Sequence, residues 1–256
     1  MWPYPRCLAH RGGGTLAPEN TLAGLKRGMA AGFRAIEFDV MLAQDGVPVL
    51  MHDPDLGRTV AGSGSVADHD ALALAALDAG SWFGPAYAGE PVPLFAEFAQ
   101  YCKAHGVWMN IEIKPVPGFD DATGRVVARM AAALFADELA GGPAAPGFAR
   151  APLLSSFSEP ALAAARAAAP HAPRALLLDD LPPDWEARAR ALDVVAIHTN
   201  HRYLTTRQAA AVRAAGFGLF CYTVNDPARA RTLLDWGVEA FCTDRIDLFT
   251  PGGEAR

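Results

Sequence analysis

The most constraining feature of this sequence is a regular alternation of short apolar runs with amphipathic helical patterns. Eight runs have the length and composition of β-strands. They span Arg6–Arg11, Ala35–Leu42, Val107–Lys114, Leu153–Phe157, Arg174–Leu178, Val194–Thr199, Gly218–Val224 and Ala240–Thr243. The helical patterns between them lie at Thr21–Ala31, Phe95–His105, Thr123–Leu139, Glu159–Ala168, Trp185–Ala191, Thr205–Ala215 and Pro227–Trp236. Such alternation predicts an α/β fold with a parallel sheet, and eight strands favour a closed (β/α)₈ TIM barrel over a doubly wound open sheet.

One connection is much longer than the others. About 40 residues separate His52 from the helical pattern that begins near Phe95, whereas a loop from strand to helix usually has about two to six residues. This stretch contains six glycines and several prolines, too many breakers for a simple helix. We therefore expect a single domain, residues 1–256, with a small insertion after the second strand at about residues 53–93. The insertion should overhang the C-terminal mouth, where barrel enzymes have their active sites.

The charge balance excludes a class of partner. The chain has 22 Lys and Arg residues against 28 Asp and Glu residues, a formal charge of −6, and no basic run. A nucleic-acid surface needs clustered positive charge, so we expect no nucleic-acid partner. An acidic protein that binds a phosphate needs a local cation instead.

Hydropathy and cysteine usage indicate the compartment. No stretch approaches the roughly 18 apolar residues of a membrane span, and the first residues lack a signal-peptide pattern. We therefore expect a cytoplasmic protein without membrane insertion. The four cysteines form no CxxC pair and are expected to be buried free thiols. The sequence leaves the oligomeric state open.

Acidic residues interrupt two of the apolar strands. Glu37 and Asp39 stand two residues apart in one strand, and Glu112 stands two residues before Lys114 in the next predicted barrel strand. Residues at this spacing share one face of a strand, so in a barrel they should meet inside, near the mouth. Three converging carboxylates repel one another unless a divalent cation lies between them, and oxygen ligands suit Mg²⁺ or Ca²⁺ and also accept Mn²⁺. The alternatives are a buried salt-bridge network with Lys114 and Arg11, or strand ends exposed to water.

Two histidines belong to the same predicted neighbourhood. His10 ends the first strand and His52 ends the apolar run before the insertion, so both should lie at the barrel mouth. Histidine exchanges a proton near neutral pH, and two of them can activate one oxygen while protonating another. Arg11 offers a planar fork that matches phosphate oxygens, and Gly12–Gly14 let backbone N–H groups approach an anion. The alternatives are structural histidines and a simple glycine turn.

Other polar residues give weaker signals. The histidines without such neighbours are expected to be surface or structural residues: His69, His105, His171, His198 and His201. Residues at or near the remaining strand ends stay candidates for lining the pocket: Ser155, His198, Asn200, Tyr222 and Asp244.

Taken in order, these motifs resemble those of the glycerophosphodiester phosphodiesterase family. The matching segments run nearly from end to end: His10–Gly13, Pro18–Thr21, Ile36–Val40, Asp45-Gly46 through His52-Asp53, Asn110–Lys114, Tyr222–Asn225 and Thr243-Asp244. Three further segments resemble the bacterial cytosolic branch that accompanies glycerol-3-phosphate uptake: Trp2–Arg6, Asp78–Phe83 and Leu153–Phe157. The specific signal is the joint order of the motifs.

The resemblance implies a fold, a reaction and a set of residues. It implies a (β/α)₈ barrel with a small insertion after the second strand, a divalent cation, and hydrolysis of glycerophosphodiesters such as glycerophosphocholine and glycerophosphoethanolamine to sn-glycerol 3-phosphate and an alcohol. By position, it places metal ligands at Glu37, Asp39 and Glu112, acid/base histidines at His10 and His52, and phosphate-binding residues at Arg11 and Lys114. Tyr222 stands where many relatives have Trp, and its ring can still pack against glycerol.

The insertion adds Trp82 and Phe83 as candidate substrate-binding residues. We expect them to pack against the glycerol end and to leave the alcohol end exposed; the alternative is that they only dock the insertion onto the barrel. Two rival functions remain. A lipid-acting relative of the sphingomyelinase D or lysophospholipase D type should have an apolar ramp or a membrane anchor. A non-catalytic binder of phosphorylated ligands would not need His10 and His52.

Overall fold

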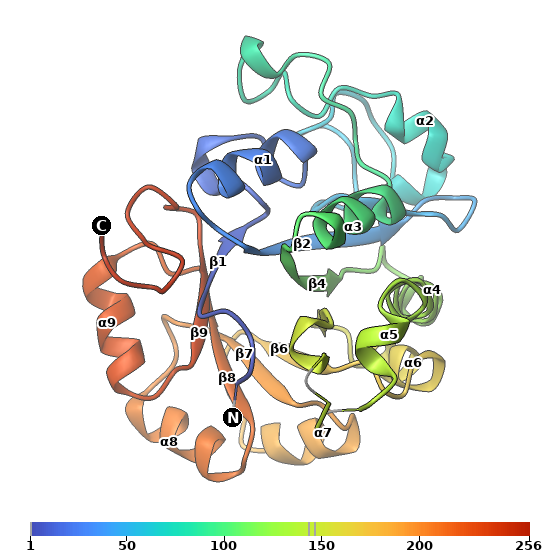
Figure 1. Cartoon of the computed structure of the whole chain (residues 1–256). Coiled ribbons are helices and arrows are strands. Elements are labelled where there is room, and N and C mark those ends of the chain that lie inside the picture. The colour runs from blue at the N-terminus through green and yellow to red at the C-terminus, as the bar shows by residue number, and fades with distance from the viewer. Residues whose placement is uncertain (1, 143, 146) are drawn as a thin grey trace.

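The apolar runs form a closed parallel barrel in the computed structural model, which describes residues 2–142, 144–145 and 147–256. The barrel strands are β1 (Cys7–His10), β2 (Ala35–Leu42), β4 (Trp108–Ile113), β5 (Leu153–Ser156), β6 (Arg174–Leu178), β7 (Ala196–Asn200), β8 (Gly218–Tyr222) and β9 (Ala240–Thr243). Each of these strands pairs in parallel with the next one named, and β1 also pairs in parallel with β9, which closes the barrel (Figure 1). The predicted (β/α)₈ TIM barrel is confirmed.

Helices surround the strands on the outside (Figure 1). They are α1 (Leu22–Ala30), α3 (Phe95–Ala104), α4 (Asp120–Leu134), α5 (Ala136–Leu139), α6 (Glu159–Ala168), α7 (Trp185–Ala191), α8 (Thr206–Ala214) and α9 (Pro227–Asp235). Their apolar faces and the outer faces of the strands form the main hydrophobic core. The single helix predicted at Thr123–Leu139 is wrong in detail, because Phe135 leaves helical geometry between α4 and α5, and its buried ring lies under the ammonium group of Lys103.

The long connection after β2 has a small core of its own. It starts with β3 (Pro48–Leu50), which pairs antiparallel with β2. It continues through the 3₁₀ turn η2 (Val66–Asp68), α2 (Ala71–Ala75) and the 3₁₀ turn η3 (Pro85–Tyr87). These elements lie to one side of the ring of helices (Figure 1). The connection and the ends of β2 and β4 contribute to a buried apolar cluster separate from the main core: Met41, Ala43, Val49, Met51, Val60, Val66, Ala71, Leu74, Ala79, Val92 and Val116.

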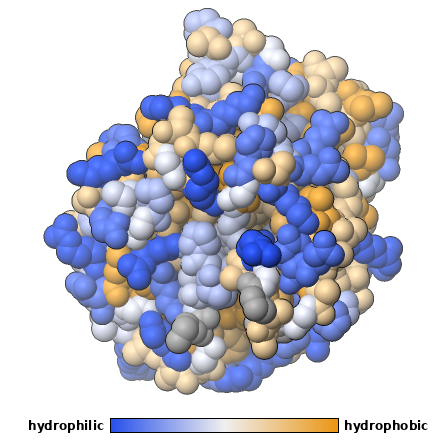
Figure 2. Space-filling view, in the orientation of Figure 1, coloured by the Kyte–Doolittle hydropathy of each residue, from blue (hydrophilic) through white to orange (hydrophobic). Residues whose placement is uncertain are grey.

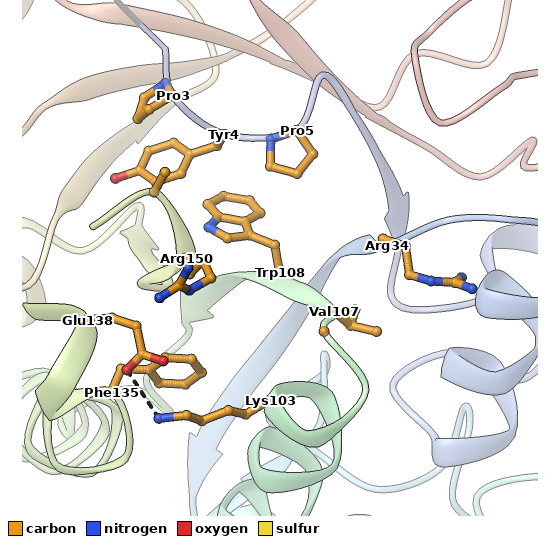
Figure 3. A pocket seen from close by; sticks show the side chains of 12 residues that line it. Pro3, Tyr4, Pro5, Arg34, Lys103, Val107, Trp108, Phe135, Glu138 and Arg150 are labelled. Carbon is orange, nitrogen blue, oxygen red and sulfur yellow. Dashed lines mark hydrogen bonds and ion pairs between the residues drawn. The ribbon is translucent and has the colours of Figure 1, made fainter. Parts of the chain in front are cut away.

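The N-terminal end of the barrel is closed by aromatic rings. Trp2 stacks on Phe220 at 6.0 Å between ring centroids, and Tyr4 stacks on Trp108 at 4.7 Å. Figure 3 shows Tyr4 next to Trp108 at the edge of a cavity of 480 Å³. These rings separate the interior of the barrel from solvent at this end, so access to the interior is from the other end.

The surface mixes polar and apolar residues. Figure 2 shows hydrophilic residues spread over the whole of the face seen in Figure 1, with hydrophobic ones between them. None of the helices in the described part of the chain combines the length and the apolar character needed to cross a bilayer. Two further 3₁₀ turns, η1 (Gly14–Leu16) and η4 (Phe148–Arg150), complete the secondary structure of the described residues.

Candidate active site

The mouth of the barrel contains a cavity of 230 Å³. Eight of the ten side chains predicted for the site line it: His10, Arg11, Glu37, Asp39, His52, Glu112, Lys114 and Tyr222. The cavity at the opposite end is larger, but Glu138 is the one acidic residue among the described residues that line it, and Glu138 is paired with Lys103 (Figure 3). The clustering of charged groups therefore identifies the smaller cavity as the candidate active site.

The three predicted metal ligands form one buried cluster. Strands β2 and β4 are neighbours, with Asp39 opposite Glu112 and Glu37 opposite Asn110. Because Glu37 and Asp39 are two residues apart, both point into the barrel beside Glu112. One carboxylate oxygen from each acid lies within 4.8 Å of the other two, and all three residues are buried. Hard oxygen donors at this separation fit a divalent cation.

Asp39 already has positively charged partners. Lys114 Nζ donates to Asp39 Oδ1 at 3.2 Å, and Arg11 Nε lies 3.5 Å from Asp39 Oδ2. Asn20 Nδ2 also donates to Asp39 Oδ2, at 2.9 Å. Burial acts to raise the pKa of Asp39, but Lys114 and Arg11 outweigh it and lower that pKa well below its usual value. Asp39 is therefore ionised in the protein without a bound cation.

The other two carboxylates lack sufficient positive charge. Burial raises the pKa of Glu37 well above its usual value, and repulsion from Asp39 and Glu112 adds to the effect. Burial also raises the pKa of Glu112 to about 7, with a further contribution from Asp39. Lys114 lies 3.6 Å from Glu112 but is shared with Asp39. A divalent cation supplies the charge that this cluster lacks, so the donor set fits such an ion.

His10 stands at the end of β1 between two carboxylates. Its Nδ1 lies 2.6 Å from Asp244 Oδ1, and its Nε2 lies 3.6 Å from Glu37 Oε2. An ionised carboxylate only accepts hydrogen bonds, so Nδ1 carries the proton and Nε2 faces the acidic cluster. Asn225 Nδ2 donates to the other oxygen of Asp244 at 2.9 Å. The pairing of β1 with β9 brings together His10 and Asp244, which are 234 positions apart.

His52 has a carboxylate partner of its own. Its Nδ1 lies 2.6 Å from Asp53 Oδ1, which leaves Nε2 available. Burial lowers the pKa of His52, and the nearby cations Arg11 and Lys114 oppose its protonation as well, whereas Asp39 favours it. The net shift keeps the ring neutral near pH 7, the form that accepts a proton.

A chain of ion pairs holds Asp53 in place. Arg58 donates to Asp53, and this hydrogen bond is the main reason why the pKa of Asp53 falls to about 2. Arg58 also donates to both oxygens of Glu19, at 2.7 and 2.8 Å. Glu19 in turn accepts from Arg11 Nη1 at 2.8 Å. These contacts tie the start of the long connection to the loop after β1.

The glycines after β1 serve close packing. A Cβ atom on Gly14, whose φ is +55°, would lie 2.1 Å from the carbonyl oxygen of Asp244. One on Gly12, whose φ is +88°, would lie 2.9 Å from the backbone nitrogen of Leu25 in α1. Any larger residue would push the loop away from both neighbours. The close approach of the chain to α1 and to the end of β9 accounts for these two glycines without an anion.

The wall formed by the last strands is aromatic and neutral. Tyr222 at the end of β8 lines the cavity together with Phe157, which follows β5, and their rings meet edge to face at 5.8 Å. The Tyr222 hydroxyl donates to the carbonyl oxygen of Leu178 at 3.0 Å, which fixes the ring. Phe157 is 46% exposed and stands at the entrance. This wall offers flat apolar surface to a bound molecule.

Trp82 and Phe83 do not line this cavity. Their rings meet edge to face at 5.6 Å, and Phe83 meets Tyr87 in the same way at 5.4 Å. The Tyr87 hydroxyl donates to the carbonyl oxygen of Leu16 in the loop after β1, at 3.4 Å. Trp82 Nε1 donates to the carbonyl oxygen of Ala79. These contacts favour the alternative in which the aromatic residues dock the connection onto the barrel.

Comparison with known proteins agrees with the site. Residues 10–248 match the glycerophosphoryl diester phosphodiesterase family. The chain belongs to this family. Glycerophosphodiester phosphodiesterases of Bacillus subtilis and Caldanaerobacter subterraneus are similar to it, with 30% identity over 94% of this chain and 84% of the relative, and 29% identity over 96% and 98%, respectively. Members of the family are phosphoric diester hydrolases, so the chain is an enzyme of that class.

A solved family structure has the same fold. A phosphodiesterase of Oleispira antarctica, determined in complex with the product sn-glycerol-3-phosphate, superimposes with a TM-score of 0.82. It is 33% identical, and the match covers 94% of this chain and 93% of the other. The glycerophosphodiester phosphodiesterase family therefore accounts for both the barrel and the cluster at its mouth.

Several residues that orient the predicted side chains were not assigned this role from the sequence. Asp244 was a candidate for lining the pocket, but its hydrogen bond to His10 requires the closure of the barrel. Asn20 and Asp53 belong to the motifs that carry the resemblance, yet neither had an assigned role. Phe157 was the last residue of a predicted strand with no signal of its own. For Asp53, its position directly after His52 was a usable signal.

Proposed function

We propose that this enzyme hydrolyses glycerophosphodiesters, including glycerophosphocholine and glycerophosphoethanolamine, to sn-glycerol 3-phosphate and an alcohol. The observation that carries the proposal is the placement of two carboxylate-oriented imidazoles, His10 and His52, in one cavity with three buried acids. A binder of phosphorylated ligands has no need for such proton-transfer groups. The product bound to the Oleispira antarctica relative supports the choice of substrate.

In this proposal the acids hold one divalent cation, Mg²⁺ or Ca²⁺, with Mn²⁺ also compatible with oxygen ligands. Glu37, Asp39 and Glu112 would be its protein ligands. Such a cation supplies positive charge that reduces the repulsion between a phosphodiester and an incoming nucleophile. Arg11 and Lys114 line the same cavity and add two positive charges for phosphate oxygens.

The two histidines would divide the proton transfers. One Nε2 accepts the proton of the nucleophile, which is either water or the glycerol 2-hydroxyl. The other Nε2 donates a proton to the alcohol oxygen as its bond to phosphorus breaks. If the glycerol hydroxyl attacks, a cyclic phosphate forms and water then opens it. Asp244 and Asp53 hold the imidazoles in the tautomer that leaves Nε2 free for these steps.

Tyr222 would pack against the glycerol moiety, since its ring forms part of the neutral wall. We further propose that residues 1–256 act as one catalytic domain, with residues 53–93 as an insertion beside the mouth. The resemblance to the branch associated with glycerol-3-phosphate uptake supports a cytoplasmic enzyme of glycerol and lipid metabolism that acts without membrane insertion.

A coupled assay tests the proposal. Purified enzyme is given glycerophosphocholine, and glycerol 3-phosphate is detected by its dehydrogenase, with and without EDTA. We expect product that disappears with EDTA and returns when Mg²⁺ or Ca²⁺ is added in excess. Release of choline phosphate in place of glycerol 3-phosphate, or turnover of lysophosphatidylcholine alone, would show that a different bond or a lipid substrate is used.

A further inference from the structure

Three buried polar side chains inside the barrel lack hydrogen-bond partners. Asn110, Ser155 and His198 are 2%, 0% and 0% exposed. The Asn110 Oδ1, the Ser155 Oγ and both ring nitrogens of His198 find no hydrogen-bond partner among the described residues. Buried polar groups in folded proteins are nearly always hydrogen-bonded, because an unsatisfied one is costly. Four such atoms in one barrel interior require a common explanation.

These residues lie next to the acidic cluster. Asn110 is opposite Glu37 in the pairing of β2 with β4, and Ser155 is opposite Glu112 in the pairing of β4 with β5. His198 comes from β7 and lines the 230 Å³ cavity together with Asn110 and both of these acids. Asn110 and His198 therefore share this cavity with the carboxylates, and Ser155 lies beside Glu112 on the neighbouring strand without lining the cavity.

The aromatic neighbours of His198 do not satisfy its ring. The ring packs on Phe220 at 4.4 Å and on Trp2 at 6.1 Å between centroids. Phe220 has no polar group, and the indole N–H of Trp2 donates to the carbonyl oxygen of Pro5. Burial lowers the pKa of His198 to about 3, so the ring is neutral and has one donor and one acceptor to satisfy.

We propose that Asn110, Ser155 and His198 bind ordered water beneath the acidic cluster, and that this water holds the carboxylates of Glu37 and Glu112 in position for the cation. The inference deepens the proposed function and rests on its metal site. The 230 Å³ cavity can hold ordered water beside a cation, because one water molecule occupies about 30 Å³. Buried water commonly makes about three hydrogen bonds, and the polar groups here are sufficient in number.

The network makes His198 a positioning residue. In this inference it acts on the ligands through water. Groups that orient metal ligands in this way typically contribute about 10- to 100-fold to metal affinity. Its removal should therefore change cation binding directly.

The test is calorimetric titration of the metal-free enzyme with Mg²⁺ and with Mn²⁺. His198→Phe keeps a flat ring and removes both nitrogens, whereas His105→Phe makes the same change at an exposed position on the outside of the barrel. We expect cation affinity to fall about 10- to 100-fold in His198→Phe and to stay unchanged in His105→Phe. Thermal unfolding of the metal-free proteins should show that both variants are folded.

An affinity in folded His198→Phe within about twofold of wild type would overturn the inference and leave the proposed function intact. If the wild-type enzyme itself bound no divalent cation, the proposed metal site would fail first, so the two failures are distinguishable. If His198→Phe does not fold, a high-resolution crystal structure of the metal-loaded wild-type enzyme decides. Water within hydrogen-bonding distance of His198 and of Glu37 or Glu112 supports the inference, and its absence there refutes it.

Discussion

The two halves of the cavity wall differ in charge. Strands β1, β2 and β4 and the residues directly after β1, β3 and β4 supply every carboxylate, guanidinium and ammonium group that lines the cavity among the described residues, together with the imidazoles of His10 and His52. Strands β5 to β9 and the residues following them supply neutral groups: Phe157, Leu177, His198, Phe220, Tyr222, Thr223 and Cys242. The charged half can polarise a phosphate and move protons. The neutral half can exclude water and pack against the rest of a substrate.

This division follows from the order of the elements. In the charged half, acids and cations alternate over short distances, so that Lys114 lies between Asp39 and Glu112. Neighbouring charges thus partly compensate one another, and the excess negative charge is confined to the acidic cluster. The neutral half needs no such compensation, and its one titratable imidazole, His198, is kept uncharged by burial. Substitutions in the two halves should therefore have different consequences.

The largest effect is expected from Glu112→Gln in the charged half. Loss of one carboxylate ligand should weaken Mg²⁺ and Ca²⁺ binding by more than about a hundredfold and reduce turnover with it. Titration calorimetry measures the affinity. Glu138→Gln is the matched control, because Glu138 pairs with Lys103 at the other end of the barrel. Equal affinity in both variants would mean that Glu112 is not a ligand.

The next effect concerns the carboxylates that orient the histidines. Asp53→Asn and Asp244→Asn keep size and remove the negative charge beside Nδ1 of each histidine. We expect kcat on glycerophosphocholine to fall about 10- to 100-fold, while cation affinity changes little. Steady-state kinetics with a metal titration separate the two quantities. A rise in KM at constant kcat would show that these acids serve binding instead.

The charged half also predicts a pH dependence of cation binding. Burial and Asp39 raise the pKa of Glu112 from 4.5 to about 7, so a proton competes with the cation below that pH. Affinity should increase as the pH rises through about 7, by up to about tenfold per pH unit for each proton released. Calorimetry in buffers of different ionisation enthalpy counts those protons. Affinity that is independent of pH between about 6 and 8 would contradict the raised pKa.

The raised pKa of Glu112 has the opposite effect on the stability of the metal-free protein, which should fall as the pH rises. A raised carboxyl pKa favours folding at low pH, where the group is protonated in both states. That contribution to stability is lost as the pH rises from 4.5, the ordinary pKa of the carboxyl group, through about 7, the pKa of Glu112 in the folded protein. Metal-free enzyme should therefore unfold at a lower temperature at pH 8 than at pH 5.5, and added cation should reduce the difference. Differential scanning calorimetry measures both.

The smallest effects are expected in the neutral half. Phe157→Leu and Tyr222→Phe should raise KM for glycerophosphocholine less than about tenfold and leave kcat nearly unchanged, because they alter packing and one hydrogen bond. Trp82→Ala provides the contrast. Its contacts are within the long connection, so we expect a lower Tm with an unchanged KM. A higher KM with an unchanged Tm would instead support the sequence-based expectation that Trp82 contacts the glycerol end.

The sequence predicted the charged half better than the neutral half, for a physical reason. Charged residues inside apolar strands are conspicuous, and the two-residue spacing of Glu37 and Asp39 determines their shared face. A buried Phe or Ser in a strand end resembles ordinary core. His198 was expected at the surface or in a structural role with only a chance of lining the pocket, because nothing in its neighbouring residues reveals that β7 points it into the cavity.

Fold prediction was limited in a similar way. The barrel follows from the alternation of strands and helices, because each pattern is local. The bond between His10 and Asp244 and the contact of Arg58 with Glu19 join distant segments. They depend on how the barrel closes and how the long connection folds back. The periodic pattern of apolar residues does not specify such long-range contacts, so only the structure reveals them.

The most direct test of the two-histidine mechanism assigned to the charged half is the kcat of His10→Ala and His52→Ala on two substrates. On glycerophosphocholine each variant should lose about 10² to 10⁴ in kcat with cation affinity retained. On a diester with p-nitrophenol as leaving group, the variant that lacks the general acid should recover most of that loss, because the departing oxygen needs no proton. Near-normal turnover of glycerophosphocholine by both variants would contradict a two-histidine mechanism and assign the proton transfers to other groups.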